Sequence, residues 1–215
     1  MFAGVPDTQL EQIAKVAFQR RVPRLTTIVR AGDSTDSLYV LISGSAKVLN
    51  SDEEGREVIL TLLGPGEFFG EMGLIDGSPR SADVMSTETC ELLVITKNDF
   101  KRCLAENFDL CLNIMKSLVQ RLREADRNIE SLALMDVYGR VAKLLLDFSE
   151  EERGERIIRR RLTKQDIAKM IGASREMVSR VMKDLENQGY FRVEDGRIVI
   201  LEKRVPAPNA AAARP

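Results

Sequence analysis

The stretch GEFFGEMGLIDGSPRSADV, residues 66–84, places an acid and a base among four glycines. Glu71 and Arg80 are separated by nine positions, and the hydroxyl of Ser81 directly follows Arg80. Glycine allows an anion to approach the main chain closely, and arginine can bind a phosphate through two parallel hydrogen bonds. An ionised glutamate only accepts hydrogen bonds, so it suits a sugar hydroxyl better than a phosphate. The pattern indicates a site for a phosphorylated sugar, in which one turn of helix over FGEMGLI presents N–H groups to the anion.

A second interpretation of the same stretch needs no ligand. The glycines would then form a corner of a β-structure, and Arg80 and Glu71 would form an ion pair with each other. The spacing alone leaves both interpretations open.

The residues around this stretch favour a β domain. Between positions 24 and 100, short aliphatic and β-branched segments such as TTIVRAG (26–32) and CELLVI (90–95) alternate with turn signals such as Gly-Pro-Gly (64–66). Strands at this spacing without intervening helices are typical of a sandwich or barrel. An amphipathic helix over about residues 7–18 is expected to precede them.

The hydrophobic pattern changes period over residues 98–134. Phe108, Met115, Leu122 and Ile129 recur every seven positions, and no proline interrupts them. This pattern predicts one long helix with a continuous apolar seam. A seam of this length favours pairing with a second copy of the chain, and the alternative is a helix packed on its own domain.

The C-terminal third predicts a helical region that ends in a hairpin. Residues 136–151 are expected to form one amphipathic helix, and residues 162–191 to form two helices joined tightly. Thr163 and Ser174 are suited to cap the starts of these two helices, and Gly172 to end the first of them in the left-handed conformation. The segment FRVEDGRIVIL (191–201) predicts a hairpin, which gives a helix-turn-helix followed by a wing.

The second helix of this motif carries polar side chains on one face of its first turns. Such a helix presents side chains to the major groove, where arginine can bind guanine and glutamate can accept from cytosine. Residues 153–204 contain fourteen Lys and Arg against eight Asp and Glu, which suits a DNA phosphate backbone. The alternative is an ordinary solvated helix, which the capped two-helix pattern disfavours. The predicted base-reading residues are Arg175, Glu176, Ser179 and Arg180, and the predicted phosphate contacts are Thr163, Lys164, Gln165, Ser174 and Lys183.

Composition narrows the classes of function. The chain has 215 residues, a formal net charge of −1 and no histidine, so any basic surface must be local. Its three cysteines have no C-x-x-C spacing and cannot alone supply the four thiolates of an iron–sulfur cluster. Because histidine is the commonest zinc ligand and the proximal ligand of most haems, we expect no metal and no haem. We also expect no enzymatic activity, because no Walker loop, nucleophile elbow or metal cluster is present. No segment resembles a signal peptide or membrane span, so a cytoplasmic location is expected.

The cassette at 66–84 and the segment SREMVSRVMKDLE (174–186) together closely resemble the cyclic AMP receptor protein/fumarate-nitrate regulator (Crp/Fnr) superfamily of transcription regulators. The resemblance spans about residues 7–203. It implies an α+β fold made of a cyclic-nucleotide-binding β-roll (1–106), a long dimerisation helix (107–135) and a winged helix-turn-helix (136–205), followed by a disordered tail (206–215).

The resemblance also implies roles for individual residues and partners. Glu71 would bind the ribose 2′-hydroxyl, and Arg80 and Ser81 the cyclic phosphate. The partners would be double-stranded DNA with a TGTGA-like palindrome, a second copy of the chain and RNA polymerase. The predicted nucleotide-binding residues are Gly70, Glu71, Met72, Gly73, Arg80, Ser81, Ala125 and Asp126.

Two positions depart from the cyclic AMP receptor pattern. Ala125 and Asp126 stand where that receptor has a Thr-Ser pair against adenine, and a carboxylate suits the adjacent donors of guanine. The resemblance implies cyclic AMP as the effector, whereas Asp126 favours cyclic GMP or cyclic di-GMP. The alternative for Asp126 is an ion pair with Arg121, Arg123 or Arg127 of either chain. Ser179 replaces a glycine and resembles the oxygen-sensing branch, so it could shift the half-site towards TTG. That branch itself is disfavoured, because its N-terminal cysteine cluster is absent.

The sequence therefore predicts a homodimeric regulator in which nucleotide binding shifts a helix and a hinge around residues 134–137 into a DNA-competent arrangement. Two alternatives remain open. The pocket could be vestigial, or the β-roll could belong to the regulatory subunit of an enzyme such as a kinase.

Overall fold

The computed structural model describes residues 7–152, 154–160, 162–194 and 196–201. The chain divides into two compact units, Met1–Ile129 and Glu130–Pro215, which are described separately. The predicted tail at 206–215 lies outside the described residues.

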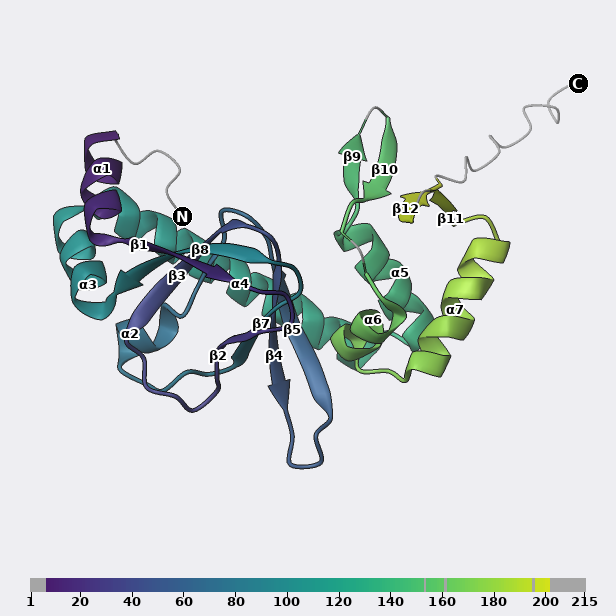
Figure 1. Cartoon of the computed structure of the whole chain (residues 1–215). Helices are drawn as coiled ribbons and strands as arrows, with labels where there is room; N and C mark the ends of the chain where they lie inside the picture. Colours follow the sequence, from purple (N-terminus) through teal and green to yellow (C-terminus); the bar gives the residue numbers. More distant parts are fainter. Residues whose placement is uncertain (1–6, 153, 161, 195, 202–215) are drawn as a thin grey trace, which may run out of the picture. The chain divides into compact units, whose positions relative to one another are not determined.

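The N-terminal unit is built around two four-stranded antiparallel sheets (Figure 1). Leu41 and Leu92 of one sheet and Leu63 and Val84 of the other belong to one buried apolar cluster, which shows that the two sheets pack face to face. The first sheet contains, in order, β1 (Phe18–Val22), β8 (Cys90–Thr96), β3 (Ser37–Ser43) and β6 (Phe68–Phe69), and the second contains β2 (Thr27–Val29), β7 (Asp83–Ser86), β4 (Ala46–Ser51) and β5 (Glu57–Leu63).

Helices cover the outer face of the first sheet. Phe100, Leu110 and Ile114 from the helices share a second buried cluster with Leu38 and Ile95 from the strands. The helices of this unit are α1 (Asp7–Val16), α2 (Met72–Asp76), α3 (Lys97–Glu106) and most of α4 (Phe108–Leu134).

The single helix predicted over residues 98–134 is wrong in one respect, because Asn107 interrupts it. Asn107 adopts an extended conformation between α3 and α4, and its side-chain amide donates to the carbonyl of Cys103 at 3.0 Å. Asparagine competes with helical hydrogen bonds in this way because its short side chain reaches nearby main-chain groups. The heptad pattern therefore begins with α4 itself.

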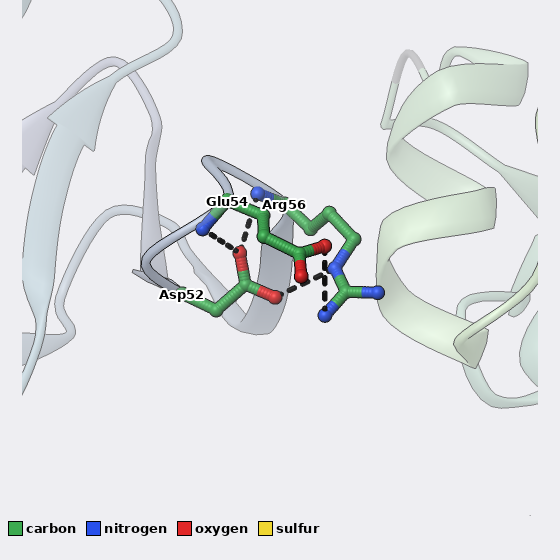
Figure 2. Close-up of polar contacts among 3 residues, drawn as sticks. All are labelled: Asp52, Glu54 and Arg56. Atoms are coloured by element: carbon green, nitrogen blue, oxygen red, sulfur yellow. Dashed lines mark hydrogen bonds and ion pairs between the residues drawn. The ribbon is translucent and has the colours of Figure 1, made fainter.

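The loop between β4 and β5 is closed by its own polar side chains (Figure 2). Asp52 Oδ1 accepts from the main-chain N–H groups of Glu54 and Arg56, at 3.0 and 2.8 Å, and Asp52 Oδ2 accepts from Arg56 Nε at 2.6 Å. These hydrogen bonds from Arg56 hold the pKa of Asp52 below its ordinary value. The tip of the hairpin is thus ordered by local contacts without any apolar core.

The C-terminal unit packs three helices against one small sheet. Its sheet has the strand order β11-β12-β10-β9, and its helices bury one apolar cluster that includes Val141, Ile167 and Val178. The elements are α5 (Val137–Asp147), β9 (Glu150–Glu152), β10 (Glu155–Ile158), α6 (Lys164–Ile171), α7 (Arg175–Asn187), β11 (Phe191–Glu194) and β12 (Arg197–Ile200).

The helix predicted over residues 136–151 ends early, at Asp147, and two strands follow it. The strands are held in place by partners distant in sequence: Ile158 of β10 is buried in the core and pairs with Ile198 of β12. The hairpin predicted over residues 191–201 is confirmed as β11 and β12. The α+β fold, with an N-terminal β domain, a long helix and a helix-turn-helix with a small sheet, is confirmed.

Candidate effector site and nucleic-acid interface

The cassette places Arg80 in a setting made largely of main-chain oxygens. Its guanidinium donates through Nη1 to the carbonyl of Gly70 at 2.9 Å and through Nη2 to the carbonyl of Ser37 at 2.8 Å. Asp36 Oδ1 lies 3.3 Å from Nη2, and the guanidinium carbon lies 5.7 Å from the centroid of the Tyr39 ring. Arg80 is only 7% exposed. Two neutral carbonyls hold the guanidinium in a fixed orientation, and the exposed Asp36 carboxylate forms an ion pair with it.

Gly70 is required by this arrangement. Its φ is +84°, which side chains rarely adopt, and a Cβ atom there would lie 2.4 Å from Arg80 Nη1. The main chain therefore approaches the guanidinium closely only because residue 70 has no side chain.

Glu71 has a different partner from the one that either sequence interpretation named. Glu71 is 1% exposed, and its carboxylate lies 2.7 Å from Nη1 of Arg121 on α4. Arg121 also donates to the carbonyl of Phe68, and its guanidinium carbon lies 4.9 Å from the centroid of the Phe68 ring. The ion pair between Arg80 and Glu71 that the ligand-free interpretation proposed is not among these contacts, because each residue is engaged elsewhere.

Sequence reasoning missed Arg121 as part of this site. It named Arg121 only as a partner for Asp126, whereas Arg121 is directed to Glu71, fifty positions away in the sequence. The one local signal was its place in the helix predicted to pair with a second copy. A glutamate that is buried needs a cationic partner, but the sequence does not show that Glu71 is buried.

The other predicted cassette residues differ in exposure. Gly73 is buried, whereas Met72 and Ser81 are exposed, and Ser81 Oγ lies 3.7 Å from Met72 Sδ. Ala125 and Asp126 lie on the exposed surface of α4, and neither takes part in the contacts that hold Glu71 and Arg80. The structure thus gathers Gly70, Glu71 and Arg80 with Arg121, and leaves the two predicted base-contacting positions apart from these contacts.

The caps of the two-helix motif are confirmed. Thr163 Oγ1 accepts from the main-chain N–H of Asp166 at 3.1 Å, and Ser174 Oγ accepts from that of Met177 at 3.1 Å. Gly172 ends α6 with a φ of +63°. Arg140 of α5 donates to the carbonyl of Ile171 at 2.7 Å, which ties the turn between the helices to the rest of the unit.

The apolar side chains of α7 determine which face of the helix is buried. Val178, Val181, Met182 and Leu185 enter the apolar core, so the opposite face of the helix is directed to solvent. Arg175, Glu176 and Arg180 are exposed there, and Ser179 is partly buried.

The predicted phosphate-contacting residues lie around the same helix. Ser174 is exposed at its start, and Thr163, Lys164 and Gln165 are exposed at the start of α6. Lys183 is exposed one turn after Ser179. Lys164 Nζ donates to Ser179 Oγ at 3.2 Å, which joins a predicted phosphate contact to a predicted base-reading residue.

Among the residues that the structure describes, no cluster of three or more cysteine and carboxylate side chains suited to a metal ion is found. In the same part of the chain, every helix is too short or too polar to span a membrane.

Comparisons with known proteins agree with both halves of the chain. Residues 19–107 match the model of the cyclic nucleotide-binding domain, and residues 139–204 match that of the Crp-like helix-turn-helix domain. The cAMP-activated global transcriptional regulator CRP of Haemophilus influenzae is 36% identical over 191 residues, covering 86% of this chain and 84% of that protein. The cAMP-activated regulator Vfr of Pseudomonas aeruginosa is 35% identical over 205 residues, covering 91% and 94%.

Solved structures give the same result. The c-di-GMP responsive global regulator CLP of Xanthomonas campestris has a TM-score of 0.77 and 30% identity, and the match covers 92% of this chain and 100% of that one. The catabolite activator protein of Thermus thermophilus has a TM-score of 0.57 and 30% identity, covering 94% and 93%. These relatives are transcriptional regulators and not enzymes. The chain therefore belongs to the Crp/Fnr family of transcriptional regulators, with a cyclic nucleotide-binding domain and a Crp-like helix-turn-helix domain.

Proposed function

We propose that the protein is a homodimeric transcription regulator whose DNA binding is controlled by a cyclic nucleotide held at Arg80 and Glu71. The observation that carries this proposal is the anchoring of Arg80 by the carbonyls of Gly70 and Ser37. A guanidinium held by neutral oxygens keeps its positive charge for an anion, and its fixed orientation lowers the cost of ordering it on binding. Asp36, whose side chain is 78% exposed, can exchange that contact for water when a phosphate arrives.

Arg121 gives the cassette a connection to α4. In this proposal the ribose 2′-hydroxyl approaches Glu71, which Arg121 already holds, so a ligand acts on the pair and through it on the helix. The ligand would thereby favour one arrangement of α4 and of the segment between α4 and α5. Met135 and Asp136 form that segment, and the Asp136 carboxylate caps α5 by accepting from the N–H of Gly139 at 2.8 Å.

Two observations bear on the identity of the effector, and they favour different nucleotides. The curated relatives at 35–36% identity are cAMP-activated, which favours cyclic AMP. Asp126 and the structural relative named as c-di-GMP responsive favour a guanine nucleotide. Ala125 and Asp126 would contact the base in either case.

For DNA, the proposal assigns base reading to α7. Arg175, Glu176 and Arg180 are exposed on the face opposite the buried stripe, and each can address base edges in a major groove. The half-site would be TGTGA-like, with Ser179 adjusting the preference. Thr163, Lys164, Gln165, Ser174 and Lys183 would contact phosphates.

The second copy of the chain is proposed from the surface of α4. Met115, Val119, Leu122 and Ile129 are all about half exposed or more, although each is apolar. Their spacing of four, three and seven places them on one stripe of the helix, as in a coiled-coil seam. Two copies would place two α7 helices in successive major grooves, roughly 34 Å apart. RNA polymerase is the expected further partner of such a complex.

The proposal predicts that Arg80→Ala weakens nucleotide binding by roughly two orders of magnitude, because it removes one half of a buried charge-assisted contact. Calorimetric titration of the purified protein with cyclic AMP, cyclic GMP and cyclic di-GMP measures this. Arg102→Ala, which removes an exposed arginine of α3, is the control and should bind as the wild type does.

In the nucleotide titration, Asp126→Ala should lose any preference for a guanine nucleotide over cyclic AMP.

The regulatory role is tested by titrating a DNA duplex that carries a TGTGA palindrome with the protein, in the presence and absence of each nucleotide. DNA binding that is equally tight with and without every nucleotide would contradict the regulatory role and favour a vestigial pocket.

A further inference from the structure

The hydrogen bond between Lys164 and Ser179 joins the start of α6 to the exposed face of α7. Lys164 is the first residue of α6, and its ammonium lies 3.2 Å from the hydroxyl oxygen of Ser179, fifteen positions later. Ser179 follows Arg175 by four positions, about one helical turn, so these two residues share a face of α7. This contact lies at the part of α7 that is proposed to read DNA, and the inference drawn from it rests on that proposed function.

A recess of about 400 Å³ lies beside the contact. It is lined by Lys164, Ser179, Lys183 and Glu186 together with the apolar side chains of Met182, Phe191 and Val193. The recess holds two lysines, and the ammonium of Lys164 is directed to the hydroxyl of Ser179. Lys183 is therefore a natural comparison, because it is an exposed lysine of the same recess on the same helix as Ser179.

The chemistry of a serine hydroxyl makes this contact informative. A hydroxyl has one proton to donate and two lone pairs that accept. An ammonium group has no acceptor, so in this contact the hydroxyl can only accept. The hydroxyl proton then remains for another acceptor, and the nearby positive charge makes it a stronger donor.

We propose that Lys164 is a positioning residue that makes Ser179 a hydrogen-bond donor to the base pair it faces. Bases differ in what they offer a donor: thymine O4, guanine O6 and the purine N7 atoms accept, whereas cytosine N4 only donates. Lys164 occupies one of the two lone pairs of Ser179, and its charge strengthens the hydroxyl as a donor, so Ser179 prefers a base that presents an acceptor. Without Lys164, the hydroxyl rotates freely and accepts or donates equally, so the preference at that position falls.

This role differs from a phosphate contact in what it changes. A lysine that contacts only phosphate weakens binding to all sequences by a similar factor and reduces the dependence of affinity on salt. A lysine that orients Ser179 changes the ratio of affinities between bases at one position of each half-site. The two roles are therefore separated by measuring ratios rather than affinities.

The test uses the full-length protein with and without each of the three cyclic nucleotides. The preferred site is selected from random duplexes with the wild type, and every base pair of one half-site is then changed in turn. Binding of each duplex is measured by fluorescence anisotropy for the wild type, Ser179→Ala, Lys164→Met, the double variant and Lys183→Met. Lys164→Arg keeps a cationic donor and serves as the conservative variant.

We expect Ser179→Ala to flatten the base preference at one position, and Lys164→Met to reduce the preference at that same position by roughly threefold to tenfold, the range for one hydrogen bond. The double variant should match Ser179→Ala, Lys164→Arg should retain the preference, and Lys183→Met should weaken all duplexes equally. Equal weakening of all duplexes by Lys164→Met would overturn the inference and leave Lys164 as a phosphate contact. Failure to select any duplex would instead refute the proposed function, and this inference with it.

Discussion

Glu71 is a carboxylate almost fully removed from water, and its stability in the folded protein depends on Arg121. Burying a charge costs several kcal/mol unless an opposite charge and hydrogen bonds compensate it. Arg121 supplies both, since it pairs with Glu71 and also donates to the carbonyl of Phe68. The guanidinium also lies over the Phe68 ring, so Arg121 is held by three contacts: the Glu71 carboxylate, the Phe68 carbonyl and the Phe68 ring.

This arrangement gives a prediction at the scale of residues. Arg121→Met leaves the Glu71 charge uncompensated and should lower the free energy of unfolding by about 2–4 kcal/mol, somewhat less than for a fully buried pair because the Arg121 side chain is 31% exposed. Urea denaturation of the N-terminal unit, followed by circular dichroism, measures the loss. Glu71→Gln combined with Arg121→Met should restore part of it, and a double variant no more stable than Arg121→Met alone would contradict this explanation.

Residue-scale features were predictable from the sequence when they depend on neighbours in the chain. The nearness of Gly70 and Arg80 follows from their place in one cassette, and the structure brings them together. The Arg121 partner of Glu71 could not be predicted, because it is set by how α4 packs on the sheet rather than by any spacing. A local pattern identifies a charged residue but does not identify the distant residue that neutralises it.

At the scale of elements, the same distinction explains which boundaries were predicted correctly. The start of α7 at Ser174 and the end of α6 at Gly172 follow from capping chemistry within a few residues. The strands β9 and β10 exist because Ile158 is buried and pairs with Ile198, forty positions away. The break at Asn107 is local in origin, since its side-chain amide donates to the carbonyl of Cys103, but the apolar pattern did not mark it.

The cap of α7 carries a prediction. Ser174→Ala removes the acceptor for the N–H of Met177 and should destabilise the start of α7 by about 1 kcal/mol. Hydrogen exchange of the Met177 and Val178 amides, measured by NMR, should accelerate about fivefold, the factor that 1 kcal/mol represents. Ser174→Asp keeps an acceptor and should retain slow exchange, and Ser78→Ala, in an exposed turn of the other unit, should leave α7 unchanged.

At the scale of the whole molecule, the apolar stripe of α4 is the feature that most needs a partner. Isolated exposed apolar residues are ordinary on protein surfaces, but a heptad-spaced row is not. The fold class and the order of its parts were predictable because they rest on long, periodic segments. The assembly of two copies remains a prediction that a single chain does not test.

Leu122→Glu should therefore shift the protein from dimer to monomer, because it places a charge at the centre of the proposed seam. Light scattering coupled to size-exclusion chromatography gives the mass directly. Ile42→Glu changes another exposed apolar residue, on β3 rather than on α4, and should leave the mass unchanged. A wild-type protein of monomer mass at micromolar concentration would contradict the proposed dimer.

The boundary between the two compact units falls after Ile129, inside α4, which continues to Leu134. Continuous helix, rather than a linker of turn residues, therefore joins the two halves at that point. To express the two units separately, or to fuse the helix-turn-helix domain to a different sensor domain, the chain is best divided at Met135 and Asp136. A cut after Ile129 would divide α4 and leave part of that helix at the end of each fragment.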